Sequence, residues 1–116
     1  MKKISYDNLI QFHQEVLAKI GLDEYSVDAV TTGLCETSLR GVDSHGVRLL
    51  PHYVKSSLSG RKNPQPKYNI SKTFPSIAHL DADNAFGHAA GMKSIEVAME
   101  MAEVQGVGVV AVSNSS

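Results

Sequence analysis

Ten residues, from Leu39 to Arg48, hold the side chains best suited to bind a small anion and to move a proton. The segment contains two arginines, an aspartate, a serine, a histidine and two glycines. A guanidinium group binds a carboxylate through paired hydrogen bonds, and an imidazole exchanges its proton near neutral pH. The segment therefore predicts a site for a small, negatively charged substrate that gains or loses a proton.

The same segment predicts the start of a helix that would bring these groups together. A serine hydroxyl at a helix N-cap accepts a hydrogen bond from a free backbone N–H, so we expect the helix to begin at Ser44. Ser44, His45 and Arg48 would then share one face, next to the positive end of the helix dipole. Each of the three also has an ordinary structural role near a helix start, and spacing alone favours that role over catalysis. Asp43 either pairs with Arg40 or faces solvent.

Apolar spacing and capping residues predict the elements around this segment. We expect helices over residues 5–20, 26–39 and 44–59, short strands over 68–72 and 77–81, a turn over 81–87, a long helix over 87–105 and a fully buried strand over 106–112. Pro51 lies inside the third helix, so either that helix is bent or a tight turn precedes a helix that begins near Pro51. The order predicts an α/β protein with a helical part (1–60), a linker (61–67) and an α/β part (68–116). The last strand leads into Ser113–Ser116, the kind of strand end at which α/β proteins bind ligands.

Composition narrows the class of protein. The chain has 116 residues, 42% of them hydrophobic and 20% charged, which is typical of one small globular domain. Eleven basic and twelve acidic residues are well mixed, which argues against nucleic acid as the main partner. No apolar run is long enough to span a membrane and no signal core follows the first residues, so we expect a cytoplasmic protein.

The remaining candidate ligands have ordinary structural interpretations. Cys35, the single cysteine, lies in an apolar helical pattern and is expected to be a small buried side chain. We expect His13 to be a partly buried structural histidine and His88 to lie at the surface. The five histidines show no ligand spacing with the cysteine or the acids, so no metal site is predicted.

The motifs, taken in order, resemble the N-terminal part of the malate/L-lactate dehydrogenase type 2 family. That family also includes ureidoglycolate, sulfolactate and diketogulonate dehydrogenases and cyclic-imine reductases. The residues that carry the resemblance are Arg40–Arg48 with Tyr53 and Gly60, then Asp81–Gly87, then Gly106–Ser113. The resemblance implies an NAD(P)-dependent oxidoreductase that acts on small 2-oxo or 2-hydroxy acids and is usually a homodimer.

The resemblance also assigns roles to individual residues. By this likeness, Ser44 and His45 take part in proton transfer, and Arg48 binds the carboxylate of the substrate. The family binds NAD or NADP in a large domain that is not a Rossmann fold. In agreement with this, the chain has no Gly-x-Gly-x-x-Gly between a strand and a helix. The cofactor-binding residues are not identified and would lie mostly beyond Ser116.

Members of the family are much longer than this chain. The resemblance therefore implies an N-terminal fragment without the main cofactor domain, inactive when it is alone. The alternative is a non-catalytic helical interaction module or a degenerate truncated product, whose exposed apolar surface would drive self-association. The sequence does not decide which acid is used, whether NAD or NADP is preferred, or the direction of the reaction.

Overall fold

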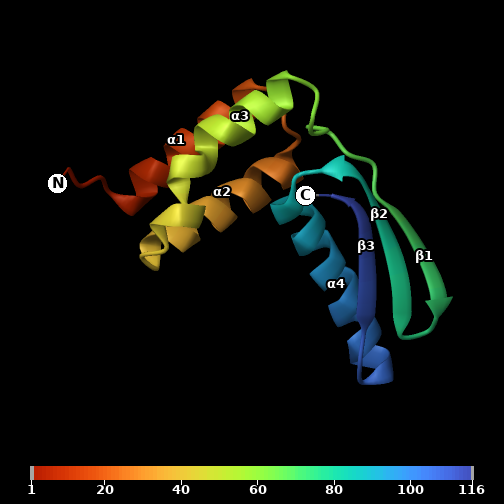
Figure 1. Cartoon of the computed structure of the whole chain (residues 1–116). Coiled ribbons are helices and arrows are strands. Elements are labelled where there is room, and N and C mark those ends of the chain that lie inside the picture. Colours follow the sequence, from red (N-terminus) through yellow and green to blue (C-terminus); the bar gives the residue numbers. More distant parts are fainter. Residues whose placement is uncertain (1, 116) are drawn as a thin grey trace. The chain divides into compact units, whose positions relative to one another are not determined.

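The computed structural model describes residues 2–115, which form two compact units that divide between Gln65 and Pro66. The first unit is helical and the second combines a sheet with one helix (Figure 1). The chain is therefore an α/β protein, as its sequence predicts.

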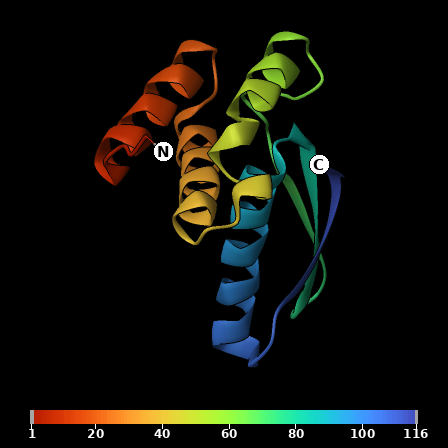
Figure 2. The ribbon, with the colours of Figure 1, turned by 60° about the vertical axis from the view of Figure 1, so that its left-hand side comes forward.

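The helical unit begins with a pair of packed helices, α1 (Tyr6–Lys19) and α2 (Glu24–Leu39) (Figures 1 and 2). Helix α1 begins where the sequence predicts, whereas α2 begins two residues earlier than the predicted range 26–39. The Ser5 hydroxyl accepts a hydrogen bond from the Asn8 N–H at 3.2 Å, and the Asp23 carboxylate accepts one from the Ser26 N–H at 2.8 Å. These caps satisfy backbone donors that have no partner inside the helix. The unit buries mainly aliphatic side chains: Leu17, Leu22, Val27, Val30, Leu34 and Leu50.

A histidine and the cysteine are also buried in this unit. His13 is only 1% exposed, and its Nδ1 lies 2.8 Å from the Leu9 carbonyl oxygen, so it is a structural histidine, buried more deeply than the sequence suggests. Cys35 is a free, fully buried thiol, as expected. Burial, and then the nearby Glu36 carboxylate, raise the pKa of the Cys35 thiol. The reactive thiolate form is therefore disfavoured.

The helix expected over residues 44–59 is wrong in its first part. Two short 3-10 turns, η1 (Asp43–His45) and η2 (Val47–Leu49), come first, and α3 (Leu50–Leu58) follows. Pro51 is the second residue of α3, and a helix could not extend far back through it, because proline has no N–H and its ring clashes with the carbonyl four residues earlier. The alternative, a tight turn before a helix that begins near Pro51, is confirmed.

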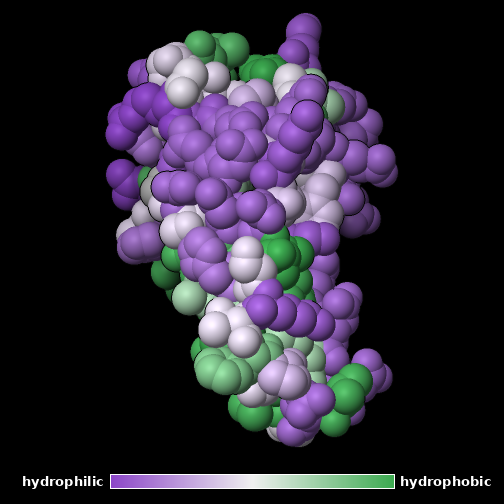
Figure 3. Space-filling model, turned by 90° about the vertical axis from the view of Figure 1, so that its right-hand side faces the viewer, coloured by the Kyte–Doolittle hydropathy of each residue, from purple (hydrophilic) through white to green (hydrophobic). Residues whose placement is uncertain are grey.

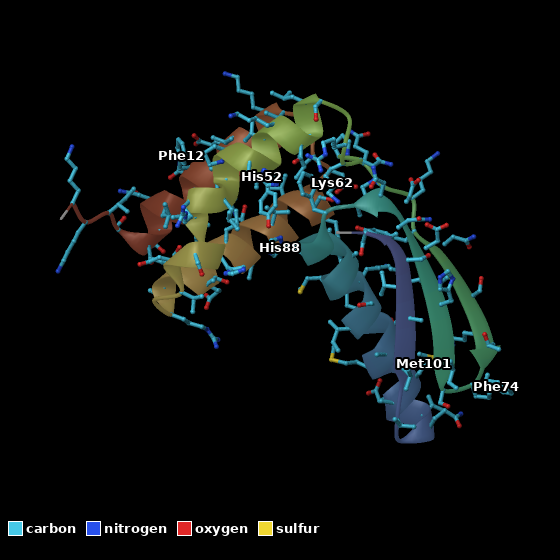
Figure 4. The ribbon with its side chains drawn as sticks, in the orientation of Figure 1. Phe12, His52, Lys62, Phe74, His88 and Met101 are labelled. Atoms are coloured by element: carbon cyan, nitrogen blue, oxygen red, sulfur yellow. The ribbon has the colours of Figure 1, made fainter. Side chains whose placement is uncertain are left out.

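The second unit is a three-stranded sheet with a helix on one face. Strand β1 (Asn69–Phe74) pairs antiparallel with β2 (Ile77–Ala85), and β2 pairs parallel with β3 (Val109–Ser115) in the order β1-β2-β3. Helix α4 (Gly87–Gln105) connects the two parallel strands, as a parallel pair requires. Alternate residues of β2, namely Ala78, Leu80 and Ala82, are buried. Ala78 packs with Met101 of α4, which is labelled in Figure 4, and with Val110 of β3.

Strand β2 is longer than the sequence predicts, and the turn expected over residues 81–87 is instead an irregularity within it. The register with β3 shifts between Asp81 and Ala85. Asp83 and Asn84 adopt positive φ angles of 53° and 63° at this point. Aspartate and asparagine tolerate this conformation better than other non-glycine residues, which explains how turn-like residues are included in a strand.

Strand β3 begins and ends three residues later than the predicted range 106–112, and its expected burial is not observed. Val109 and Val112 are 53% and 39% exposed. A continuous apolar run predicts cover on both faces, whereas within residues 66–115 helix α4 covers one face only and β3 pairs with one neighbour. Hydrophobic groups gather toward the lower end of the view in Figure 3, where the β1–β2 turn and the α4–β3 connection lie. Exposed apolar residues of that region include Phe74, Ile77, Val104 and Val107. No helix among the described residues is long and apolar enough to cross a membrane.

Candidate active site

The segment from Asp43 to Leu49 is tied to the end of α2. Gly41, at a φ of 82°, turns the chain out of that helix. The Gly41 N–H donates to the Ser38 carbonyl at 3.0 Å, and the Val42 N–H donates to the Thr37 carbonyl at 3.1 Å. Positive φ values are easily adopted only by glycine, so Gly41 fixes where this exit occurs.

Ser44 and His45 are brought into direct contact. The Ser44 Oγ lies 2.8 Å from the His45 Nδ1, and both side chains are exposed. Ser44 is not a helix N-cap, which corrects the prediction, because its hydroxyl bonds the neighbouring ring, and the N-cap residues of η1, η2 and α3 are Val42, Gly46 and Leu49. The pairing engages Nδ1, so Nε2 is the ring nitrogen of this exposed side chain that is left for another partner.

The two charged candidates beside this pair are also exposed. Arg48 lies in η2, three residues after His45, and makes no hydrogen bond to Ser44 or His45 in the described structure. Asp43 and Arg40 are exposed and form no ion pair with each other among the described residues, so the solvent-facing alternative for Asp43 holds. Arg48 therefore presents a full positive charge close in sequence to a serine–histidine pair.

A residue that the sequence analysis missed supports this segment. The Ser38 Oγ, in the last turn of α2, accepts a hydrogen bond of 2.8 Å from the Val47 N–H. The bond joins residues nine positions apart, and no short-range pattern predicts it. A serine in the last turn of a helix, shortly before Gly41, was the available signal, but serine is common at such positions.

A second polar group lies in the other unit, at the carboxyl ends of β2 and β3. The Asp81 carboxylate accepts hydrogen bonds of 3.0 Å from the Asn114 side-chain amide and from the Asp83 N–H. These bonds lower the pKa of Asp81, the Asn114 bond most. The Nε2 of His79 lies 2.9 Å from the Ser113 Oγ. Polar groups thus occupy the strand end at which the sequence suggests a ligand site; Ser116, also part of that expectation, lies outside the described residues.

The structure also places the two other candidate histidines, His88 and His52. His88 is partly buried rather than at the surface, which corrects the prediction, and burial lowers its pKa. His52 is exposed on α3 beside the Tyr53 ring (Figure 4). Among residues 2–115, no three histidine, cysteine or acidic side chains are grouped so that they could hold a metal ion.

The β2–α4 turn differs from that of a dinucleotide-binding fold. In a Rossmann fold, the corresponding turn carries several glycines so that its backbone can approach a pyrophosphate. Here buried Phe86 precedes α4 and Gly87 is its first residue. The helix pair, the Ser44–His45 contact and this βαβ connection together define an α/β protein of a class distinct from the Rossmann dehydrogenases.

The comparisons with known proteins identify the family. The sequence profile of the malate/L-lactate dehydrogenases matches residues 4–116. The chain is 41% identical over 114 residues to malate dehydrogenase from Pyrococcus abyssi, covering 98% of this chain and 32% of that protein. It is 33% identical over 111 residues to ureidoglycolate dehydrogenase (NAD(+)) from Escherichia coli strain K12, covering 96% of this chain and 32% of that protein.

The structural comparison agrees. The structure of malate dehydrogenase from Pyrococcus horikoshii OT3 superposes with a TM-score of 0.95 at 36% identity, over 99% of this chain and 33% of that one. The chain belongs to the malate/L-lactate dehydrogenase family. It spans about a third of the length of the relatives it matches.

Proposed function

We propose that this chain supplies the proton-transfer and carboxylate-binding side of a dehydrogenase that interconverts a small 2-hydroxy acid and its 2-oxo acid. The observation that carries the proposal is the 2.8 Å contact between the Ser44 Oγ and the His45 Nδ1, three residues before exposed Arg48, in a member of this family. A cytoplasmic location and a homodimer are part of the same proposal.

The pair is suited to move one proton at a defined atom. In the protonated ring, Nδ1–H donates to the Ser44 Oγ and Nε2 carries the second proton. Nε2–H can give that proton to the carbonyl oxygen of a 2-oxo acid as the oxygen becomes a hydroxyl, which leaves a neutral ring with its proton on Nδ1; in the oxidative direction the free Nε2 takes the proton back. Ser44 holds the ring and its tautomer through both steps.

Arg48 is suited to hold the acid. Its guanidinium is always charged and has the planar geometry to bind a carboxylate through two parallel bonds. A carboxylate bound in this way keeps the adjacent carbon and oxygen in one orientation relative to the imidazole. The substrate class is therefore an acid with oxygen on the carbon next to its carboxylate.

The hydride partner is proposed on other grounds. NAD or NADP would supply or accept the hydride, as the name of the NAD(+)-dependent relative suggests for this family. The described residues do not fit a pyrophosphate site at the β2–α4 turn, and we assign no residue of this chain to the cofactor. We accordingly expect no turnover from residues 1–116 alone.

A chimera tests the proposal. Residues 1–116 would replace the matching third of the P. horikoshii enzyme, and oxaloacetate reduction would be followed by nicotinamide absorbance. We expect activity in the chimera and its loss in the Ser44→Ala, His45→Ala double variant. A chimera that melts cooperatively, close to the parent enzyme, yet reduces no oxaloacetate would contradict the proposal and favour a non-catalytic module. If the chimera does not fold, a graft of residues 39–50 alone makes the same comparison.

A further inference from the structure

The backbone between the Ser44–His45 pair and Arg48 is fixed from outside the segment. The first N–H groups of a short helical turn have no partner within it, and in η2 one of these donors is the Val47 N–H. The Ser38 hydroxyl of α2 accepts its hydrogen bond at 2.8 Å. A side chain of one helix thus caps a separate turn of the chain.

Gly46 shows how closely the two segments approach. It is buried although the residues on its N-terminal side, including His45, are exposed. A Cβ atom at Gly46 would lie 2.0 Å from the Ser38 Oγ and 3.1 Å from the Ser38 Cβ. The φ of Gly46 is −101°, so the glycine is needed for space and not for a left-handed conformation. The backbone therefore rests directly on the Ser38 side chain.

Among the described residues, the other contacts that fix this segment in place include one at each end. At the start, the Val42 N–H bonds the Thr37 carbonyl, and at the end Leu50 is buried. Between them, the other backbone bonds are local ones, from the His45 N–H to Val42 and from the Leu49 N–H to Gly46. The Ser38 contact is thus the long-range link at the centre of the segment.

We propose that Ser38 is a positioning residue of the substrate site. Its hydroxyl, with the absence of a side chain at Gly46, sets the distance and orientation between the Ser44–His45 pair and the Arg48 guanidinium. The inference rests on the proposed function, because it assigns Ser38 a part in aligning the proton donor with the bound carboxylate. It predicts that loss of one hydroxyl, which touches neither substrate nor cofactor, reduces turnover.

The first test uses the full 116-residue chain and needs no activity. In the Ser38→Ala variant we expect hydrogen exchange at the Val47 amide to accelerate about fivefold, the equivalent of one ordinary hydrogen bond, and the His45 ring resonances to shift. Ser38→Thr, which keeps the Oγ atom, should restore most of the protection. The matched control is Thr37→Val, which removes a hydroxyl from the same turn whose bond stays within α2, at 2.6 Å to the Gly33 carbonyl.

The second test measures kcat and KM of the chimera well below its melting temperature. Ser38→Ala should lower kcat and raise KM for the acid, each by about fivefold or more, whereas Thr37→Val should change neither. If Ser38 has only a structural role, Ser38→Ala will lower the melting temperature but leave kcat and KM of the folded chimera unchanged. That result would overturn the proposal. Unchanged Val47 exchange in Ser38→Ala would overturn it as well.

Failure of the proposed function has a different signature. An unmodified chimera that folds but has no activity refutes the proposed function. It also refutes the positioning role, even if Ser38→Ala still accelerates Val47 exchange, because the contact would then be structural only.

Discussion

The contact between Ser38 and Gly46 makes a quantitative prediction about stability. In Gly46→Ala, the new methyl group would lie 2.0 Å from the Ser38 Oγ, far inside ordinary van der Waals contact. Overpacking of this kind costs roughly 1–3 kcal/mol. If the methyl pushes the two segments apart, the Val47–Ser38 hydrogen bond is lost as well, at a further cost of about 1 kcal/mol. We therefore expect the free energy of unfolding to fall by roughly 2–4 kcal/mol.

A double-mutant cycle on Ser38 and Gly46 distinguishes a steric clash with the Ser38 hydroxyl from a destabilisation by alanine at position 46 that is independent of Ser38. Ser38→Ala alone should cost about 1 kcal/mol, the value of one hydrogen bond. Once the hydroxyl is removed, the atoms nearest to the new methyl are the Cβ and Cα of residue 38, at 3.1 and 3.2 Å. These distances are only slightly shorter than ordinary van der Waals contact, so small shifts of the backbone relieve them. The double variant should therefore be close in stability to Ser38→Ala, with a coupling energy of roughly 2–4 kcal/mol in magnitude. Urea unfolding followed by circular dichroism measures all four proteins, and additive costs would refute the steric explanation.

Three further predictions concern the substrate, pH and the sheet unit. Arg48→Lys in the chimera should raise KM for the acid roughly tenfold, because the ammonium is a point charge and lacks the planar, two-bond geometry of the guanidinium. The control Arg40→Lys, at another exposed arginine, should leave KM unchanged. If both variants change KM equally, Arg48 is not part of the substrate site. Tyr6 donates a 2.7 Å hydrogen bond to a carboxylate of α2, which raises its pKa from 10.0 to about 12. Its stabilising contribution should be complete below pH 10 and disappear as pH rises through about 12, a loss that Tyr6→Phe should not show in alkaline unfolding. Gly108→Ala would place a methyl 2.1 Å from the Ala98 carbonyl oxygen of α4 and should lower the melting temperature. Gly91→Ala, inside α4 with open space around it, should raise the melting temperature because alanine favours a helix more than glycine does. A higher melting temperature for Gly108→Ala than for Gly91→Ala would contradict this packing.

Local signals predicted most of the elements. The predicted range 5–20 placed α1 within one residue at each end, and the predicted range 87–105 gave the bounds of α4. These elements are determined by caps, glycines and periodicity, which act over a few residues. The family was also recognisable, since its motif is a continuous run around Ser44 and His45.

The sequence was less informative where a side chain has two possible partners or where the partner is distant. Ser44 was equally able to cap a helix or to bond the next ring, and Pro51 decides between them by preventing a helix through the segment. The Ser38–Val47 bond depends on how the chain folds back on α2, which no local pattern encodes. The burial of β3 depends on which layers cover it, and the apolar run describes only the strand itself.

The central claim is that His45 transfers the proton. It is tested most directly by turnover of the His45→Ala chimera with and without added imidazole, with exposed His52→Ala as the matched control. Loss of a general acid–base group typically lowers the rate by 10²–10⁴-fold, so we expect a fall of at least roughly 100-fold in His45→Ala and none in His52→Ala. Imidazole should restore part of the lost rate in proportion to its concentration. A His45→Ala chimera that turns over at the parent rate would contradict the account.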